Sequence, residues 1–294
     1  MRWPGRWLLA AGGVAAAAVT LASPSAGGPV ARPAPATTSL PCGRDTVPVL
    51  ADRLPFGPGE RLSYVATLNG LRAATADIEV QERATVDGKL SYPVAVKAQS
   101  NAVVSLWARM DAQLVTQLDP DRVLPWSMKS LTRGDKMDYQ EDIRFPHGTT
   151  AVAASTRLNG KRAEQQLPVT GDALDVLGLV YYARSRDVAP GRRFCMELYQ
   201  GRLLWRIRGT VSGPETVQTD AGPFEAWAAR GEAVALLAGG RGPALLKQPR
   251  PFQTWMTADQ DRIPLLLQAP TPYGEIVVKL TRFEQGRRLA RARR

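Results

Sequence analysis

The sequence is poor in the side chains on which most metal and enzyme sites depend. Its 294 residues include one histidine, His147, and two cysteines, Cys42 and Cys195. A lone histidine has no second histidine with which to bind a metal, and the two thiols lie far apart without ligand spacing. We therefore predict no metal site and no cofactor, and we expect His147, which lies in a polar turn, to be exposed.

Motifs of nucleophilic and nucleotide chemistry are absent as well. The chain has no Gly-x-Ser-x-Gly elbow and no glycine-rich phosphate loop. Two carboxylate pairs remain, Asp119 with Asp121 and Asp259 with Asp261. Such pairs on one turn are commonly turn formers, whereas glycoside hydrolysis needs two carboxyl groups facing each other across a cleft. We predict that the protein is not an enzyme, and a hydrolase using the acidic turns is the weaker alternative.

Only the N-terminus contains a long apolar run. Two arginines precede an apolar stretch from Leu8 to Ala22, and small residues follow it. The stretch is short for a membrane span of about 20 residues, and its pattern is typical of a Sec signal peptide cleaved after Ala22 or Ala26. An uncleaved membrane anchor is the alternative. We expect residues 1–26 to be the signal peptide and the mature protein to be periplasmic.

The two cysteines, Cys42 and Cys195, are predicted to form a disulfide. An even number of cysteines in an oxidising exported compartment favours a bridge, which would attach the N-terminal arm to the domain. Two unpaired buried thiols are the alternative. Lipid attachment is not expected, because Cys42 lies too far beyond the apolar run.

Acidic residues are too few to balance the basic ones. Lysine and arginine number 38 against 27 aspartates and glutamates, a formal net charge of +11. Much of the excess lies in five arginines near the C-terminus, Arg287, Arg288, Arg291, Arg293 and Arg294. Such a tail suits an anionic lipid, lipopolysaccharide or acidic glycan surface, and a solvated tail is the alternative. No strand has the mixed basic and aromatic pattern of a base-stacking surface, so we predict no nucleic-acid partner.

What the sequence has in abundance is alternation of apolar and polar residues. The stretch 74–80 alternates, and the same period of two recurs at 203–207 and 276–280. Hairpin signals such as Asn69-Gly70, Asp87-Gly88 and Asn159-Gly160 separate such stretches. The alternation predicts many strands, each with one wet and one buried face.

One stretch alone, from about Ala173 to Arg186, has helical spacing, and Asp172 is the expected N-cap. We also expect a bulge near Glu141 and a long loop at 238–251, whereas 107–118 fits either a strand or a short helix. The predicted organisation is a Pro/Ala-rich arm (27–51), a single β-rich domain (52–284) and a basic tail (285–294).

A single short helix cannot cover so much apolar sheet surface, so the sheet must curl over itself. We predict a mainly β fold, a curled antiparallel sheet or half-barrel with one packed helix, from Asp172 to Arg186, plugging or gating the concave side. The interior is either hollow or filled. If it is hollow, large aromatic residues on separate strands are the candidates for its lining: Tyr64, Trp107, Tyr181, Trp205 and Trp255. If it is filled, these aromatic residues form the core.

Four segments resemble the family called domain of unknown function 3108, in order and spacing, over roughly residues 52–283. They are Pro55–Tyr64, Asp175–Arg184, Ala221–Phe224 and Trp255–Pro264. The resemblance implies an exported protein with no agreed activity and no catalytic residues to carry over. Its pattern is similar to the half-barrels of periplasmic lipoprotein carriers, as an analogy of fold. Gly178 departs from the family, which often has serine there.

These observations favour an exported envelope protein that binds or carries an apolar or amphiphilic ligand such as a lipid. An interaction module that docks a periplasmic protein or glycan is the alternative. It would have a filled interior and an exposed apolar or aromatic patch.

Overall fold

The structure is a computed structural model that describes residues 42, 54–101, 109–135, 137–145, 147, 151–186, 188–236, 248–271 and 273–287. The strands of the first half are β1 (Arg61–Leu68), β2 (Leu71–Val80), β3 (Ala84–Val86), β4 (Lys89–Ser100), β5 (Met110–Leu118), β6 (Pro125–Gly134), β7 (Met137–Arg144), β8 (Ala151–Leu158) and β9 (Lys161–Pro168). The second half contains β10 (Ala173–Leu174), α3 (Val176–Arg184), β11 (Arg193–Gln200), β12 (Leu203–Thr219), β13 (Gly222–Leu236), β14 (Arg250–Thr257), β15 (Pro264–Thr271) and β16 (Gly274–Glu284).

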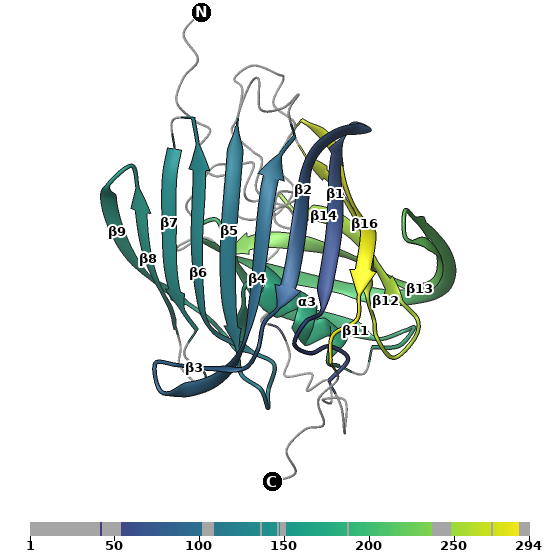
Figure 1. The fold of residues 1–294 in the computed structure, drawn as a ribbon, viewed down its shortest axis with the longest axis horizontal. Coiled ribbons are helices and arrows are strands. Elements are labelled where there is room, and N and C mark those ends of the chain that lie inside the picture. The colour runs from purple at the N-terminus through teal and green to yellow at the C-terminus, as the bar shows by residue number, and fades with distance from the viewer. Residues whose placement is uncertain are drawn as a thin grey trace, which may run out of the picture.

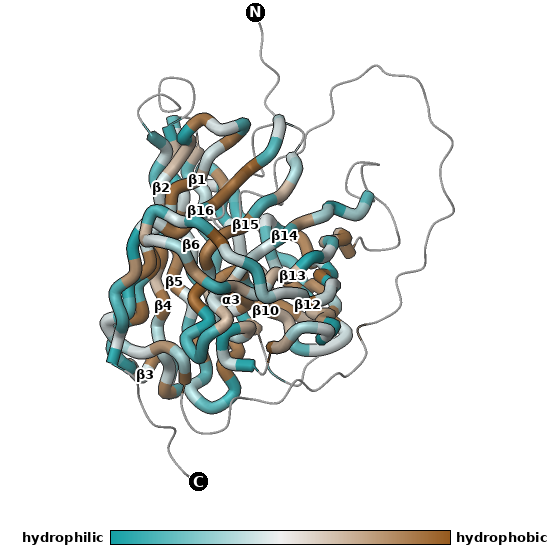
Figure 2. Tube along the Cα trace, turned by 90° about the vertical axis from the view of Figure 1, so that its right-hand side faces the viewer, coloured by the Kyte–Doolittle hydropathy of each residue, from teal (hydrophilic) through white to brown (hydrophobic). Residues whose placement is uncertain are grey.

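These strands form one 16-stranded sheet that curls around α3 (Figures 1 and 2). Its order is β10-β11-β12-β13-β14-β15-β16-β1-β2-β4-β5-β6-β7-β8-β9, with β3 paired to β4 beside this path. Neighbours are antiparallel except the short parallel pair β10–β11. The first and last strands, β1 and β16, pair with each other, and this pairing joins the two halves into one sheet. The predicted curled antiparallel sheet with one packed helix is confirmed.

The expected hairpins form where Asn-Gly or Asp-Gly stands between alternating stretches. Asn69 and Gly70 have φ of 50° and 80°, Asp87 and Gly88 of 50° and 75°, and Asn159 and Gly160 of 47° and 83°. A turn with positive φ at both central residues matches the twist of the strands that it joins, and Asn, Asp and Gly tolerate it best. These turns set the register and hence the face that each strand buries.

The helix begins later than the sequence predicts. Asp175, and not Asp172, is the N-cap, because its carboxylate accepts a hydrogen bond from the Gly178 amide at 2.8 Å. Asp172 instead forms an exposed ion pair with Arg122. The intervening residues Ala173–Leu174 pair with β11 as a short strand.

The predicted bulge near Glu141 is absent from the described strand β7. Tyr139, Glu141 and Ile143 alternate inward, and β7 pairs with both neighbours without a register shift. Glu141 is a polar residue at a regular inward position, where three hydroxyl groups donate to it: those of Ser130 (2.9 Å), Tyr139 (2.7 Å) and Tyr199 (3.0 Å). The sequence suggested a bulge because Glu141 is polar at a position where the alternating pattern requires an inward, usually apolar, residue.

Two other stretches fall partly outside the described residues. The ambiguous stretch 107–118 is a strand, β5, from Met110, and Trp107 lies outside the described residues. Residues 237–247 of the expected loop also lie outside them, whereas Arg250 and Pro251 begin β14.

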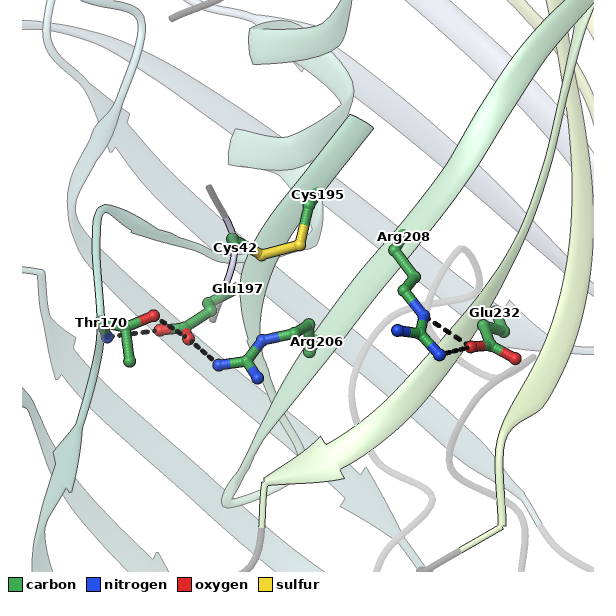
Figure 3. Close-up of a disulfide and its surroundings, with 7 residues drawn as sticks. All are labelled: Cys42, Thr170, Cys195, Glu197, Arg206, Arg208 and Glu232. Atoms are coloured by element: carbon green, nitrogen blue, oxygen red, sulfur yellow. Dashed lines mark hydrogen bonds and ion pairs between the residues drawn. A yellow bond between two sulfur atoms is a disulfide. The ribbon is translucent and has the colours of Figure 1, made fainter. Parts of the chain in front are cut away.

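The disulfide joins Cys42 to Cys195 on β11, with the two Cα atoms 5.4 Å apart (Figure 3). On the same strand, the carboxylate of Glu197 pairs with Arg206 at 2.8 Å and accepts hydrogen bonds from the amide and hydroxyl of Thr170. The bridge closes a sequence separation of 153 residues, and it anchors the one described residue of the predicted arm to the domain.

Candidate functional site

A cavity of about 240 Å³ lies between α3 and the concave side of the sheet. Its walls come from strands of both halves, β1, β2, β4, β11, β12, β13, β14, β15 and β16, and from one side of the helix. A single water needs roughly 10–15 Å³, and small-molecule sites span about 300–1,000 Å³. The cavity could therefore hold many water molecules, and its volume is close to the lower limit for small-molecule sites.

The walls of the cavity are mostly apolar, with aliphatic and aromatic side chains. Leu266, Leu267 and Met256 line it and are only partly buried. Four inward positions of the sheet carry alanine: Ala76, Ala229, Ala233 and Ala269. A larger side chain at such positions would occupy the space, so the small residues account for part of the cavity.

The helix α3 has two different sides. Leu177, Tyr181 and Arg184 are buried against the sheet, and Gly178 lies so close to β6 that an added Cβ would be 2.9 Å from the ring of Pro125. Val176, Leu179, Val180 and Ala183 line the cavity. The departure from the family pattern at Gly178 thus coincides with a close approach of the helix to the sheet. The expectation that the helix lies on the concave side is met, and its open side bounds the cavity.

Few polar groups reach the cavity. The hydroxyl of Tyr64 donates to the carbonyl of Pro264 at 2.9 Å, and burial raises the pKa of this phenol. The charged residues of the lining are Arg186, Arg192 and Arg193. Among the described residues that line the cavity, there is no carboxylate.

Of the aromatic residues expected to line a cavity, Tyr64 does so. Tyr181 is fully buried and donates its hydroxyl to Glu60; Trp205 is fully buried in a smaller core cluster with Leu198 and Ile207. The indole of Trp255 donates to Glu215 at 2.6 Å. These three residues fill the core and are not part of the lining, and Trp107 lies outside the described residues.

A buried ion pair beside the cavity was not apparent from the sequence. Arg184 on α3 forms two hydrogen bonds to the carboxylate of Glu60, at 2.6 and 2.8 Å, and neither side chain is more than 1% exposed. Arg184 also donates to the carbonyls of Pro55 and Asp261. Burial lowers the pKa of Arg184, but the adjacent Glu60 carboxylate outweighs this and raises it.

This ion pair connects three of the four segments that carry the family resemblance. Glu60 belongs to Pro55–Tyr64, Arg184 ends Asp175–Arg184, and the carbonyl of Asp261 belongs to Trp255–Pro264. The order of these segments was visible in the sequence. Their contact through the Glu60–Arg184 ion pair became visible only in the structure.

The two acidic turns are each held by hydrogen bonds within the turn. One oxygen of Asp259 accepts from the Thr257 hydroxyl and from the amides of Asp261 and Arg262, and Asp119 accepts from the amides of Asp121 and Arg122. These bonds are those of turn formers. His147 is half-buried, contrary to the expected exposure, and burial lowers its pKa.

Two features are absent from the described residues. They contain no cluster of three or more His, Cys, Asp or Glu side chains with metal-binding geometry. In the same part of the chain, no helix combines the length and apolar character that crossing a bilayer requires.

Three solved structures are similar in fold. A beta-barrel-like protein of domain of unknown function DUF1849 from Brucella abortus aligns with a TM-score of 0.50 and 12% identity, over 79% of this chain and 99% of its own. A protein assigned as exported, with a YmcC-like fold, from Bacteroides fragilis aligns at a TM-score of 0.39 and 9% identity, over 80% and 100%. A protein assigned as a lipoprotein, from Parabacteroides distasonis, aligns at 0.36 and 8%, over 79% and 99%. At 12% identity, the similarity to the Brucella abortus protein concerns the fold alone.

In sequence, no curated protein matches the chain. The family described as Protein of unknown function (DUF3108) matches residues 63–281. The match covers most of the chain and confirms the resemblance carried by the four segments. The protein therefore belongs to the family of Protein of unknown function (DUF3108).

Proposed function

We propose that this protein binds, and in the cell envelope carries, an apolar or amphiphilic ligand in the cavity between α3 and the concave side of the sheet. The observation that carries the proposal is the apolar lining around about 240 Å³ of open space. Apolar surface in contact with water is unfavourable by roughly 25 cal/mol per Å². A ligand with an alkyl part would remove this cost, whereas a polar solute would not.

The proposed location in the envelope is supported by two independent features of the chain. The N-terminal sequence has the pattern of a signal peptide. The two cysteines form a disulfide, which persists in oxidising compartments such as the periplasm. The basic C-terminal tail is proposed as a contact with an anionic surface. Of its five arginines, Arg287 is described, and its guanidinium is paired with Glu82. The other four lie outside the described residues.

We propose binding without catalysis. The carboxylates of Asp119 and Asp259 are occupied by turn hydrogen bonds, and Glu60 and Glu141 are each held by several donors within the core. A catalytic acid or base needs access to a substrate proton. This arrangement supports a structural role for these groups and leaves the cavity as the functional feature.

The test is a displacement titration of the purified protein. A fluorescent apolar probe, N-phenyl-1-naphthylamine, is bound first and then displaced with dodecanol. The double variant Ala76→Leu/Ala269→Leu places larger side chains in the cavity, and we expect its affinity for both compounds to fall by about tenfold or more. Circular dichroism verifies that the variant is folded.

The matched control for this titration is Leu71→Ser. Leu71 is 76% exposed and lies outside the cavity lining, so this change removes apolar surface without altering the cavity. We expect its affinities to equal those of the wild type. If the wild type binds neither compound, or if the filled variant binds as well as the wild type, the proposed function is wrong.

A further inference from the structure

The charged groups of the cavity lining all belong to the segment that connects α3 to β11. Arg186 follows the last turn of α3, Arg192 precedes β11, and Arg193 is its first residue. All three line the cavity, and the described lining contains no aspartate or glutamate. The rest of the wall is aliphatic or aromatic except for a few neutral polar groups such as Tyr64, so the lining combines one cationic segment with apolar walls.

The backbone holds this cationic segment in a defined position. In the connection from α3 to β11, the amide of Gly191 donates to the carbonyl of Val211 at 2.8 Å, and the amide of Val211 donates to the carbonyl of Arg192 at 2.8 Å. Gly191 has φ of 85°, a conformation that other residues rarely adopt. Arg192 is therefore presented from a tight turn that is bonded to β12.

The strand pattern directs Arg192 toward the cavity. Phe194, Met196 and Leu198 alternate along β11 and line the cavity, and Arg192 is in phase with them. Arg192 and Arg193 are exposed to solvent. A long arginine side chain can lay its methylene groups along an apolar wall while the guanidinium stays in water.

Arg186 completes this cationic segment from the helix side. It is buried, its guanidinium lies 3.9 Å from the ring centre of Tyr182, and one of its nitrogens donates to the carbonyl of Arg122 at 2.8 Å. Both Arg186 and Tyr182 line the cavity. A guanidinium fixed in this way contributes a positive charge whose position is set by the protein.

We infer that the ligand of the cavity is an amphiphile with one anionic head group, a carboxylate or a phosphate, held by Arg186, Arg192 and Arg193, with its alkyl part in the apolar cavity. Guanidinium groups bind both anions with two parallel hydrogen bonds. A cationic amphiphile of the same length would be repelled. This inference rests on the proposed function and names the ligand class of the same site. A fatty acid and a phospholipid fragment share this chemistry.

The experiment compares ligands of equal chain length and different head group. Dodecanoate, dodecanol and dodecylammonium displace the fluorescent probe at pH 8 and low salt, and dodecyl phosphate provides the phosphate arm. We expect the better anion to bind at least about tenfold more tightly than dodecanol, and dodecylammonium to bind most weakly. The advantage of the anion over dodecanol should shrink as salt is added, because charge attraction at an exposed site is screened.

The variant Arg192→Gln/Arg193→Gln tests the residues. We expect its affinity for the anion to fall several-fold toward that of dodecanol, because only Arg186 remains, with dodecanol affinity unchanged. The control Arg72→Gln/Arg162→Gln removes the same charge from two exposed arginines outside the lining, and it should behave as the wild type.

The outcomes separate this inference from the proposed function. If dodecanol and the anions bind the wild type equally, or if the control loses as much anion affinity as the test variant, the head-group inference is wrong and the cavity still binds ligands. If no amphiphile displaces the probe, the proposed function fails and the inference fails with it.

Discussion

The two sides of α3 face regions that are built alike and packed differently. On one side, the ring centres of Phe56 and Tyr181 are 4.6 Å apart, and Leu177 joins the same core cluster. On the other side, Leu179 and Ala183 face open space across from alanines. Strands of the same alternating pattern contribute to both regions, such as β5 to the core cluster and β2 to the cavity lining. The comparison teaches that side-chain size, rather than strand pattern, decides where this fold is solid and where it is hollow.

The two regions also differ in how they hold charge. On the packed side, Glu60 and Arg184 neutralise each other, and the Glu141 carboxylate accepts hydrogen bonds from three hydroxyl groups. At the hollow side, Arg192 and Arg193 reach solvent. Buried charge that is fully paired supports the fold, whereas charge at the edge of a cavity is within reach of a ligand.

The largest effect is expected on the packed side. Arg184→Met leaves the Glu60 carboxylate buried without its cation, and we expect the free energy of unfolding to fall by about 3–5 kcal/mol. Urea unfolding measures it. The control is Arg61→Gln, which breaks an exposed pair with Glu79 and should change the free energy of unfolding very little, because solvent screens such a pair.

The double variant Glu60→Met/Arg184→Met sharpens this result. It removes both charges, so we expect it to be more stable than Arg184→Met alone. Equal losses for Arg184→Met and Arg61→Gln would mean that the buried pair does not hold the packed side together.

Replacing a buried alanine with leucine is expected to have an intermediate effect on the free energy of unfolding. The sign of this effect should be opposite in the two regions. Ala76 and Ala228 are both buried in the same core cluster, but only Ala76 lines the cavity. We expect Ala228→Leu to cost about 1–3 kcal/mol through overpacking. Ala76→Leu should instead add about 0.5–2 kcal/mol by filling space. Thermal and urea unfolding measure both, and a similar loss in both variants would contradict the distinction between the regions.

The smallest loss on substitution concerns the N-cap of α3. Asp175 is buried, accepts from the Thr116 hydroxyl at 2.9 Å and from the Gly178 amide, and burial raises its pKa to about 6 from 3.8. Because the folded protein holds this proton more tightly than the unfolded chain does, the contribution of Asp175 to stability is complete below about pH 4. It is lost as the pH rises through about 6.

The N-cap prediction is measured as a difference between variants. Asp175→Asn retains an acceptor for the helix amide but does not titrate, so the stability of the wild type relative to this variant should fall between about pH 4 and pH 6. Asp175→Ala loses the cap and should cost about 1 kcal/mol. Parallel pH profiles for the wild type and Asp175→Asn would show that this carboxyl group does not titrate in the expected range.

Local pattern predicted most of the fold. The Asn-Gly and Asp-Gly hairpins, the alternating strands and the single helix are readable because each depends on neighbours within a few residues. The errors were local ambiguities. Asp172 and Asp175 both precede the helix, so the sequence did not distinguish the N-cap. Glu141 is a polar residue at an inward position, which led to the wrong prediction of a bulge.

The candidate site was less predictable. Alternation correctly implied that Tyr64, Trp205 and Trp255 have an inward face, but it does not tell whether the space in front of a side chain is filled. Only Tyr64 of these three borders the cavity. The Glu60–Arg184 pair spans 124 positions in the sequence, and no local pattern connects its partners.

By itself, the sequence determined that this chain forms a curled antiparallel sheet with one short helix, because strand period, turn chemistry and the excess of apolar sheet surface are properties of short segments and of their sum. The tertiary structure alone decided that one side of the helix is packed and the other open, and that three arginines stand at the edge of the open side. The physical reason is that open space depends on the combined volume of side chains from strands that are distant in sequence. This combination is set only when the strands pack together.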